Sequence, residues 1–458
     1  MMTRLPSLAR ADRQLLSTTA AVTVVAYVIG VTASMGRLSY DAWAALWLVP
    51  LLGGGSLLLL RRLNPCAGSV SLVPLLGVAL VVKGVGTVVR YAVTFGVYDG
   101  NGDASTYHNV GVLLAREYRH GNFDIDLGAG STSTNFIKIV TGIVYTVIGP
   151  SKSGGFAVFA TASFWGLYLA LRAFQIALPA GDARKYALLI FFLPSMLFWP
   201  SSIGKEAWMT LALGLTAYGA ARVLTHQGRA YLPLLSGLVA TLMVRPHVAV
   251  VVIAALFTGF LVRPKRGHGV LGGRLGKIIG IAVLAIVGAV AAQQMQDALH
   301  LGSSSSFNDA LDVAQERTDE GGSSFEAARI QSPFDVPWAT VTVLFRPFPF
   351  EADNAQAMVS ALEGLALAGL FVASIRQLAR VPRLALRSPY VAFAAMYSTI
   401  FVFAFSTFGN FGIITRQRVQ LFPFVLVLLC LGQTATQRNS SARSTRVVAA
   451  RTAVHAGC

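Results

Sequence analysis

Residues 71–103 read SLVPLLGVALVVKGVGTVVRYAVTFGVYDGNGD, an apolar run followed by a turn that carries Asp99 and Asp103. An α-helix needs roughly 20 apolar residues to cross the hydrocarbon core of a bilayer. The stretch therefore predicts a membrane-spanning helix with a small acidic motif directly after it.

The rest of the chain repeats this alternation of apolar runs and short polar motifs. Of the 458 residues, 54% are hydrophobic and 12% are charged, and the mean hydropathy is +0.62. Soluble domains carry roughly 25% charged residues, so lipid is the expected solvent for most of this chain. The expected fold class is all-α, a polytopic transmembrane helical bundle.

Apolar runs separated by charged residues predict about 12 spans, each about as long as a bilayer crossing requires. A shorter run, 136–149, is interrupted by Gly142 and is interpreted as a re-entrant or half-buried segment. The predicted spans are 15–35, 43–60, 71–95, 156–178, 186–199, 207–225, 231–245, 247–262, 277–295, 357–375, 389–408 and 419–435.

These spans and two long polar stretches divide the chain into six regions. The first polar stretch contains Val110, Leu113, Leu114 and Tyr118 at helical spacing, which predicts a helix from Ala104 to His120 lying on the membrane surface. The expected regions are N-terminal spans 1–96, a first extracytoplasmic loop 97–155, central spans 156–295, a second extracytoplasmic loop 296–356, C-terminal spans 357–435 and a basic cytoplasmic tail 436–458.

The positive charge of the chain predicts its orientation in the membrane. The formal net charge is +17, and Lys and Arg gather in short clusters between apolar runs, the pattern that orients membrane proteins. One side can hold all of these clusters together with both termini. We therefore expect a multi-pass protein of the plasma (inner) membrane of a bacterium with both termini cytoplasmic, whose partner is the lipid bilayer and not nucleic acid.

Cysteine usage indicates neither a disulfide framework nor a metal site. The three cysteines, Cys66, Cys430 and Cys458, are far apart in sequence. No His or Cys spacing typical of zinc or haem binding occurs, so no metal centre and no cofactor are expected from spacing alone.

The first motif that could carry chemistry is Asp99-Gly-Asn-Gly-Asp103, at the outer end of the span 71–95. Two carboxylates four residues apart on a Gly-containing turn could hold a divalent cation, or one could act as general base for an acceptor hydroxyl. Tyr107 and His108 follow on the same segment and are expected to contact substrate. The alternative is a capping turn in which Asp103 begins a helix.

Lys205-Glu206 forms the second motif, at the mouth of a span after Phe198-Trp199. Lys205 could bind a phosphate, and Glu206 could serve as base or metal ligand. The alternative is a Lys–Glu pair at the interface beside an aromatic belt. Within 71–95, Lys83 and Arg90 either join the same anion-binding pocket or pair with carboxylates such as Glu206 and Glu363.

Three further outer segments bring arginines to the membrane boundary. Two cation-capable residues in one short turn could clamp a phosphate, and the Pro-rich and aromatic segment suits a carbohydrate. Two outward arginines between the last spans run against the positive-inside trend, so an anion such as a lipid pyrophosphate would compensate them. The alternatives for the three segments, in the same order, are turn formation, an aromatic belt at the interface, and pairing of the arginines with acidic loops. The residues are Arg245 and His247; Arg346, Glu351 and Asn354; and Arg416 and Arg418.

The order of these motifs resembles the polytopic glycosyltransferases of the GT-C type. In that family an acidic motif in the first large outer loop precedes a surface helix, and Asp99, Asp103 and the stretch from Tyr107 to Asn122 are similar to it. Ser201 to Glu206 is similar to a second outer motif with an acidic residue at a span mouth. Three features depart from the pattern: two extra spans before the acidic loop, the lack of a large C-terminal soluble domain, and Lys205-Glu206 in place of a lone Asp.

The second half of the chain is also similar to polysaccharide polymerases of the Wzy type, which carry an outer loop between late spans and outward arginines. Arg245, Arg346, Arg416 and Arg418 suit that family. Both resemblances imply a polyprenyl-linked sugar donor and a glycan or lipid acceptor.

The expected function is an envelope glycosyltransferase acting at the extracytoplasmic face. Asp99 or Asp103 would activate the acceptor, with Glu206 as the competing base, and Arg245, Arg416 and Arg418 would stabilise the leaving phosphate. A Wzy-like polymerase, a transporter or flippase for lipid-linked glycans, and a non-catalytic scaffold are the alternatives.

Overall fold

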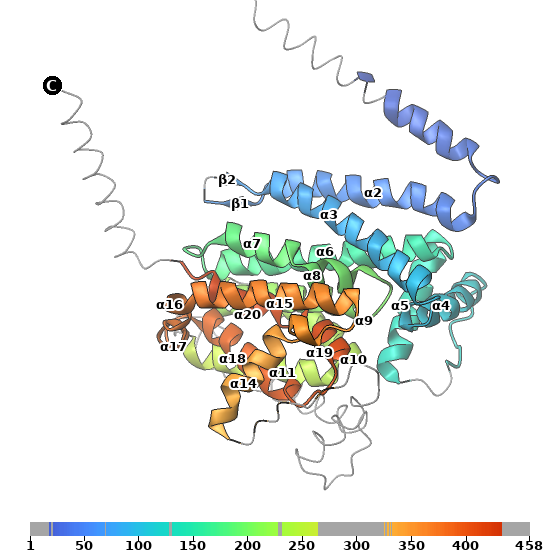
Figure 1. Cartoon of the computed structure of the whole chain (residues 1–458). Helices are drawn as coiled ribbons and strands as arrows, with labels where there is room; N and C mark the ends of the chain where they lie inside the picture. The colour runs from blue at the N-terminus through green and yellow to red at the C-terminus, as the bar shows by residue number, and fades with distance from the viewer. Residues whose placement is uncertain are drawn as a thin grey trace, which may run out of the picture.

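The computed structural model describes residues 18–19, 22–68, 70–127, 131–227, 231–263, 325, 328, 330 and 332–432. Over these residues the chain is built from helices, with one small antiparallel hairpin of β1 (Cys66–Ala67) and β2 (Val70–Ser71). Figure 1 shows two long N-terminal helices lying over a thicker helical body. The all-α fold class is confirmed.

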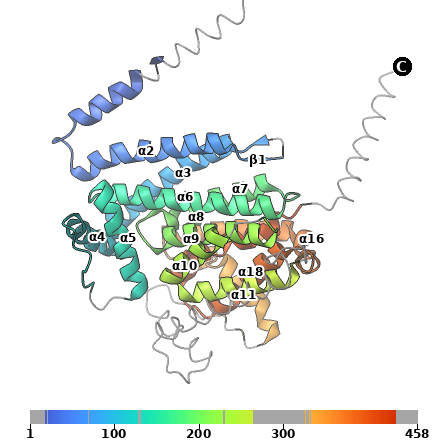
Figure 2. The same ribbon diagram turned by 180° about the vertical axis from the view of Figure 1, so that it is seen from behind.

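Three helices form the N-terminal layer: Val22–Ala33, α2 (Tyr40–Leu63) and α3 (Val73–Ala92), which continues into a π-helical turn at Val93–Val97. Trp43 ties the first helix to α2 by donating from Nε1 to the Val31 carbonyl at 2.9 Å. Asn64, in the left-handed region at φ 38°, ends α2 and begins the hairpin that returns the chain into α3. Helices α2 and α3 therefore run side by side above the body (Figures 1 and 2).

The segment after α3 folds into a helical hairpin of α4 (Asp103–Arg119) and α5 (Thr132–Ile148). The predicted helix from Ala104 to His120 is therefore present. The sequence interpretation held that Gly142 interrupts this segment, but in the structure α5 continues through Gly142 without a break. A Cβ at this position would lie 2.6 Å from Leu114 Cβ, so glycine allows α4 and α5 to pack closely.

At the buried centre of the body, α6 (Lys152–Ala177) packs against α9 (Lys205–Leu224), and α10 (Tyr231–Val244) packs on α9. A side chain at Gly166 of α6 would collide with the α9 backbone at Thr210 and Leu211. Small residues at such crossings let helix backbones approach closely, as helices packed in a membrane do. This contact holds α6 and α9 close together.

The predicted span 186–199 is not one helix. The chain forms α7 (Ala183–Phe192), α8 (Pro194–Phe198) and a 3₁₀ turn, η2 (Trp199–Ser201). Pro194 lacks the N–H that would continue α7, so the helix breaks there. Two buried ions stabilise the break: Glu363 accepts from the Ser195 N–H at 2.7 Å, and Lys83 Nζ donates to the carbonyls of Met196 and Pro200 at 3.0 and 3.2 Å.

The C-terminal half completes the body. An apolar helix, α14, lies inside the stretch 296–356 that the sequence map treats as one polar loop; it packs against α15 and α18. The elements are α11 (Pro246–Val262), η3 (Pro333–Asp335), α14 (Val336–Phe345), η4 (Pro349–Glu351), α15 (Ala355–Ala373), α16 (Ile375–Leu378), α17 (Val381–Ala385), α18 (Pro389–Phe405), α19 (Phe411–Arg418) and α20 (Phe422–Leu429).

Among the described residues, four helices are long and apolar enough to cross a membrane: α2, α6, α15 and α3 with its π-helical turn. The pair α19–α20, bent by 65°, would make a fifth. Most of α6 is buried, whereas α2, α3 and α15 expose most of their apolar side chains, as lipid-facing helices do. The apolar helices indicate a membrane-embedded protein; the 12-span map and its orientation stay predictions, and the span 277–295 and the tail 436–458 lie outside the described residues.

Candidate functional site

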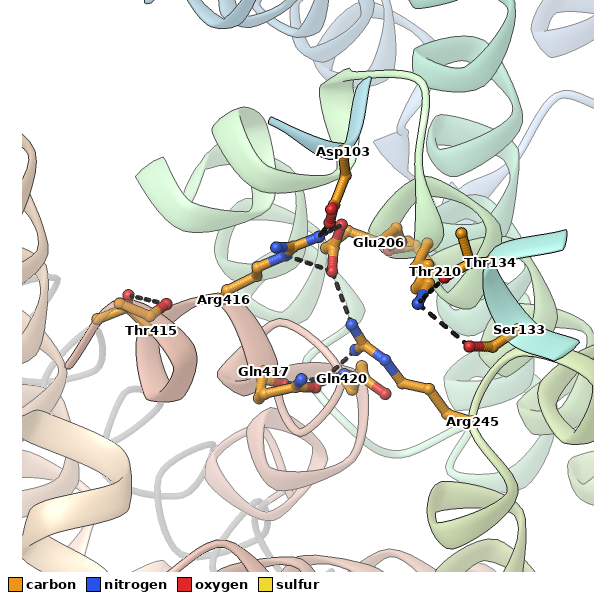
Figure 3. Close-up of polar contacts among 12 residues, drawn as sticks. Asp103, Ser133, Thr134, Glu206, Thr210, Arg245, Thr415, Arg416, Gln417 and Gln420 are labelled. Atoms are coloured by element: carbon orange, nitrogen blue, oxygen red, sulfur yellow. Dashed lines mark hydrogen bonds and ion pairs between the residues drawn. The ribbon is translucent and has the colours of Figure 1, made fainter. Parts of the chain in front are cut away.

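Four charged side chains from four separate helix ends meet in one network. Asp103 is the first residue of α4, Glu206 the second residue of α9, Arg245 the N-cap of α11, and Arg416 lies in α19. Figure 3 shows the two carboxylates facing the two guanidinium groups. Asp103 and Arg416 are 313 positions apart in sequence.

Glu206 is the centre of the network. Its Oε1 accepts from Arg245 Nη2 at 2.7 Å and from Arg416 Nε at 2.6 Å, and its Oε2 accepts from Arg416 Nη2 at 3.0 Å. Arg416 Nη2 also donates to Asp103 Oδ2 at 2.8 Å. Arg416 therefore bridges both carboxylates, and its planar guanidinium fixes their relative position.

The four side chains differ sharply in exposure. Glu206 and Arg245 are 5% and 7% exposed, whereas Arg416 is 30% and Asp103 is 55% exposed. A buried ion pair is retained only where its hydrogen bonds are well made. The network therefore has a fixed inner part, Glu206 with Arg245, and an accessible outer part, Asp103 with Arg416.

A polar pocket of about 310 Å³ opens beside the outer part of the network. Arg90 of α3 and Trp199 line it together with Asp103, Glu206 and Arg416. The other lining residues are Thr94, Tyr98, Asn101, Gly102, Ala104, Ser202, Ile203 and Gln356. The sequence analysis left the partner of Arg90 open, and the structure places it in this pocket.

Neutral groups and one further cation extend the network. Arg245 Nη1 donates to Gln417 Oε1 at 2.6 Å. Lys205 Nζ donates to Ser133 Oγ and Thr134 Oγ1, both at 3.1 Å, at the start of α5. Lys205 does not pair with Glu206, its neighbour in sequence, because the two side chains point in different directions from the start of α9.

The charges around the pocket do not balance. Arg90, Lys205, Arg245 and Arg416 contribute four positive charges, and Asp103 and Glu206 contribute two negative charges. Buried or half-buried cations in excess of their carboxylates favour an anionic ligand. The arrangement can bind a phosphate beside an accessible carboxylate.

Tyr107 and His108 are adjacent on α4 but have different neighbours. Tyr107 is buried. Burial is the main cause that raises the pKa of its phenol, and the nearby charges of Asp103 and Glu206 raise it further. His108 Nδ1 is 2.8 Å from the Tyr145 hydroxyl of α5, and burial together with the charge of Lys152 lowers the pKa of its imidazole. Tyr107 adjoins the site, whereas His108 holds the α4–α5 hairpin together.

Asp99 and His247 do not join the network. Asp99 is exposed, in the left-handed region at φ 49°, and makes no hydrogen bond within the part of the chain that the structure describes. His247 packs near the Phe405 ring, with centroids 6.0 Å apart. Of the two carboxylates in the first motif, the structure therefore brings only Asp103 to the other charged groups.

The predicted residues Arg346, Glu351 and Arg418 form a second cluster. Arg346 Nε donates to Glu351 Oε1 at 3.0 Å, and the Arg346 guanidinium lies over the Phe325 ring at 4.3 Å. Arg418 donates to the Arg346 carbonyl. Asn354 is the N-cap of α15 and accepts from the Ala357 N–H at 2.9 Å. Arg346 and Glu351 pair with each other, whereas Arg418 Nε is buried and finds no acceptor among the described residues.

The residues expected to hold a divalent cation do not form a ligand set. Asp103 Oδ2 accepts from Arg416, and Asp99 is exposed. Among the described ranges no group of three or more His, Cys, Asp or Glu side chains is placed to hold a metal ion. The geometry favours charge pairing at Asp103 over metal coordination.

The sequence analysis did not single out Gln417, Ser133, Thr134 or Gln356, although all contribute to the network or line the pocket. No sequence signal distinguishes these neutral residues from ordinary helix-end residues, because their role depends on contacts between distant segments. Comparison adds no family to this picture: no known family, curated protein or solved structure matches the chain.

Proposed function

We propose that this chain is an integral membrane glycosyltransferase that uses a polyprenyl (pyro)phosphate-linked sugar at the extracytoplasmic face for cell-envelope glycan synthesis. The observation that carries the proposal is the meeting of Asp103, Glu206, Arg245 and Arg416 beside one polar pocket. Transfer from a sugar phosphate needs a base for the acceptor hydroxyl and cations for the leaving phosphate. Both kinds of group are present within hydrogen-bonding distance of each other.

Asp103 is the group we assign as general base. It is the more exposed carboxylate, whereas Glu206 is buried and accepts from two arginines. A carboxylate held by two guanidinium groups is a poor proton acceptor. Glu206 instead orients Arg245 and Arg416.

In the proposed reaction the acceptor hydroxyl loses its proton to Asp103 as its oxygen attacks the anomeric carbon of the donor sugar. The bond from that carbon to the phosphate oxygen breaks, and its electron pair leaves with the polyprenyl phosphate. Arg416 stabilises the charge that develops on this phosphate, and Arg245, deeper in the network, adds its positive charge. If Arg416 donated its hydrogen bond to the donor phosphate instead of to Asp103, the Asp103 carboxylate would be free to accept the proton of the acceptor hydroxyl.

A transporter for the same lipids is the second candidate, because α7–α8 is a broken helix with two ions, Lys83 and Glu363, beside it. Broken helices and buried ions are features of transporter sites. Here, however, both ions are already bound to the backbone or hydroxyl of the break, at Met196, Pro200 and Ser195. Their partners make them a structural cap, which favours the enzyme.

The test uses the purified full chain in lipid nanodiscs with a panel of radiolabelled polyprenyl-phosphate sugars and a membrane-glycan acceptor extract. Asp103→Asn is expected to lower transfer at least about 100-fold, the scale of general-base loss. Asp99→Asn, four residues earlier and outside the network, is the matched control and should keep transfer. Product length separates addition of one sugar from polymerisation.

Equal transfer by the parent and the Asp103→Asn variant would remove the assignment of the base. Flipping of a labelled lipid-linked sugar in proteoliposomes, with no transfer to any acceptor of the panel, would favour the transporter instead.

A further inference from the structure

An apolar groove of about 560 Å³ runs between α3, α8 and α15. Its walls include Val85 and Val89 of α3, Phe198 of α8, and Val359 of α15. The three valines are exposed on the outside of the helical body. In a membrane this groove would be open to lipid along its length.

The groove and the polar pocket adjoin each other, since Tyr98, Trp199 and Gln356 line both of them. A ligand that occupies both would pass beside these three side chains. The pocket is polar and cationic, and the groove is apolar.

Arg90 lies at this junction, and no carboxylate of the described residues forms an ion pair with it. Its guanidinium carbon lies 4.6 Å from the Phe198 ring centroid and 4.9 Å from the Trp199 ring centroid. Its Nε is buried, and no side chain or carbonyl of the described residues accepts a hydrogen bond from it. Aromatic stacking fixes the guanidinium while leaving its donors available for an oxyanion.

We propose that the groove between α3, α8 and α15 binds the hydrocarbon chain of a phosphate-bearing lipid, and that Arg90 binds its phosphate at the mouth of the polar pocket. The proposal rests on the proposed function, because this lipid would be the sugar donor and would enter sideways from the bilayer. It identifies Arg90 as a substrate-binding residue in addition to the network of Asp103, Glu206, Arg245 and Arg416.

A second apolar groove on the other side of α3 fits such a ligand less well. It has a volume of about 640 Å³ and is lined by residues of α2, α3 and α6, none of which lines the polar pocket. The cation in its wall, Lys83, already donates to the carbonyls of Met196 and Pro200. Charge complementarity with a phosphate therefore favours the groove beside Arg90.

The test measures equilibrium binding of radiolabelled farnesyl phosphate to the full chain in nanodiscs, with empty nanodiscs subtracted. Farnesol and inorganic phosphate are the competing probes for the tail alone and the head alone. Farnesyl phosphate is expected to bind at least about tenfold more tightly than either, since it fills both ends of the cavity.

Arg90→Gln is expected to weaken farnesyl phosphate binding about tenfold, because a charge-assisted pair is lost. Arg222→Gln is the matched control, since Arg222 also stacks on an aromatic ring, Tyr218, but far from the pocket. Arg90→Lys keeps the charge and should retain more binding than Arg90→Gln.

Val359→Trp tests the groove independently of Arg90. The position is exposed, so the larger side chain fills the groove without entering the helical core. It should weaken farnesyl phosphate binding about tenfold, whereas Leu362→Trp, at an exposed position three residues further along α15 and outside the groove, should not.

Equal binding of farnesyl phosphate by the parent, Arg90→Gln and Val359→Trp proteins would overturn the inference. If those variants bind normally while Asp103→Asn abolishes transfer, the proposed function stands and this binding site falls. If they lose binding as expected but no transfer is found, the lipid site stands and the glycosyltransferase proposal falls.

Discussion

Two arginine–carboxylate clusters lie at helix ends in this protein, and they differ in what they leave available. In the cluster of Arg346 and Glu351, the carboxylate accepts from Arg346 and from the Phe348 N–H, and the guanidinium stacks on Phe325. In the cluster of Glu206 with Arg245 and Arg416, positive charges exceed negative ones and a polar pocket lies alongside. The first cluster closes a turn, and the second can receive a ligand.

The difference teaches that an Arg–Glu pair near the membrane is not by itself a site. Sequence treats the two clusters alike, because both place arginine and a carboxylate beside aromatic residues at a span end. An anion-binding role needs donors left over after the carboxylates are satisfied, and room for the anion. Three predictions test whether the first cluster only stabilises a turn and the second can bind a ligand.

Removing the carboxylate of Glu206 should have the largest effect. Glu206→Gln leaves Arg245 buried without an ionic partner, and breaking one side of a buried pair typically costs about 3 kcal/mol of unfolding free energy. Thermal unfolding in detergent measures the loss. A double variant with Arg245→Gln should recover part of it, and a single variant as stable as the parent would contradict the central role of Glu206.

Glu351→Gln should have a smaller effect on stability and none on lipid binding or transfer. The pair with Arg346 is partly exposed, so losing its charged hydrogen bonds should cost about 1–2 kcal/mol. The same unfolding assay, followed by the farnesyl phosphate measurement, checks both parts. Loss of binding in a folded Glu351→Gln protein would show that the two clusters are one functional unit.

The smallest expected effect is the pH dependence of stability that Glu351 contributes. Burial raises the pKa of the Glu351 carboxyl, but the hydrogen bonds from Arg346 and the Phe348 N–H outweigh burial and hold it below the ordinary value. A lowered folded-state pKa stabilises the protein above the ordinary Glu value, and this stabilisation is lost as the pH falls through the folded-state value.

The stability advantage of the parent over Glu351→Gln should therefore shrink as the pH is lowered from about 7 toward and below about 4, the ordinary range for Glu. Melting temperatures of the two proteins across this range measure it. A difference that does not change with pH would mean that the charge of Glu351 contributes nothing to the turn.

Much of the helix layout followed from local pattern. The apolar runs predicted α2, α3, α6, α15 and α18 to within a few residues, because burial or lipid contact demands long apolar segments in any arrangement. The helical spacing of Val110, Leu113 and Leu114 predicted α4, because the apolar face of a helix must also be buried or face lipid. The break between α7 and α8 was missed although Pro194 signals it, and only the structure shows that Glu363 and Lys83 from distant helices stabilise it.

The sequence by itself determined which residue types stand at the helix ends, and so it named Asp103, Glu206, Arg245 and Arg416 as candidates together with Asp99, His247, Arg346 and Arg418. Only the tertiary structure decided which of these meet. Arg416 and Arg418 are two residues apart on one helix, and that spacing turns their side chains to different faces, one toward Glu206 and one toward the Arg346 carbonyl. Pairing of charges depends on distances across helices, and those distances are set by packing at positions such as Gly142 and Gly166 that carry no charge.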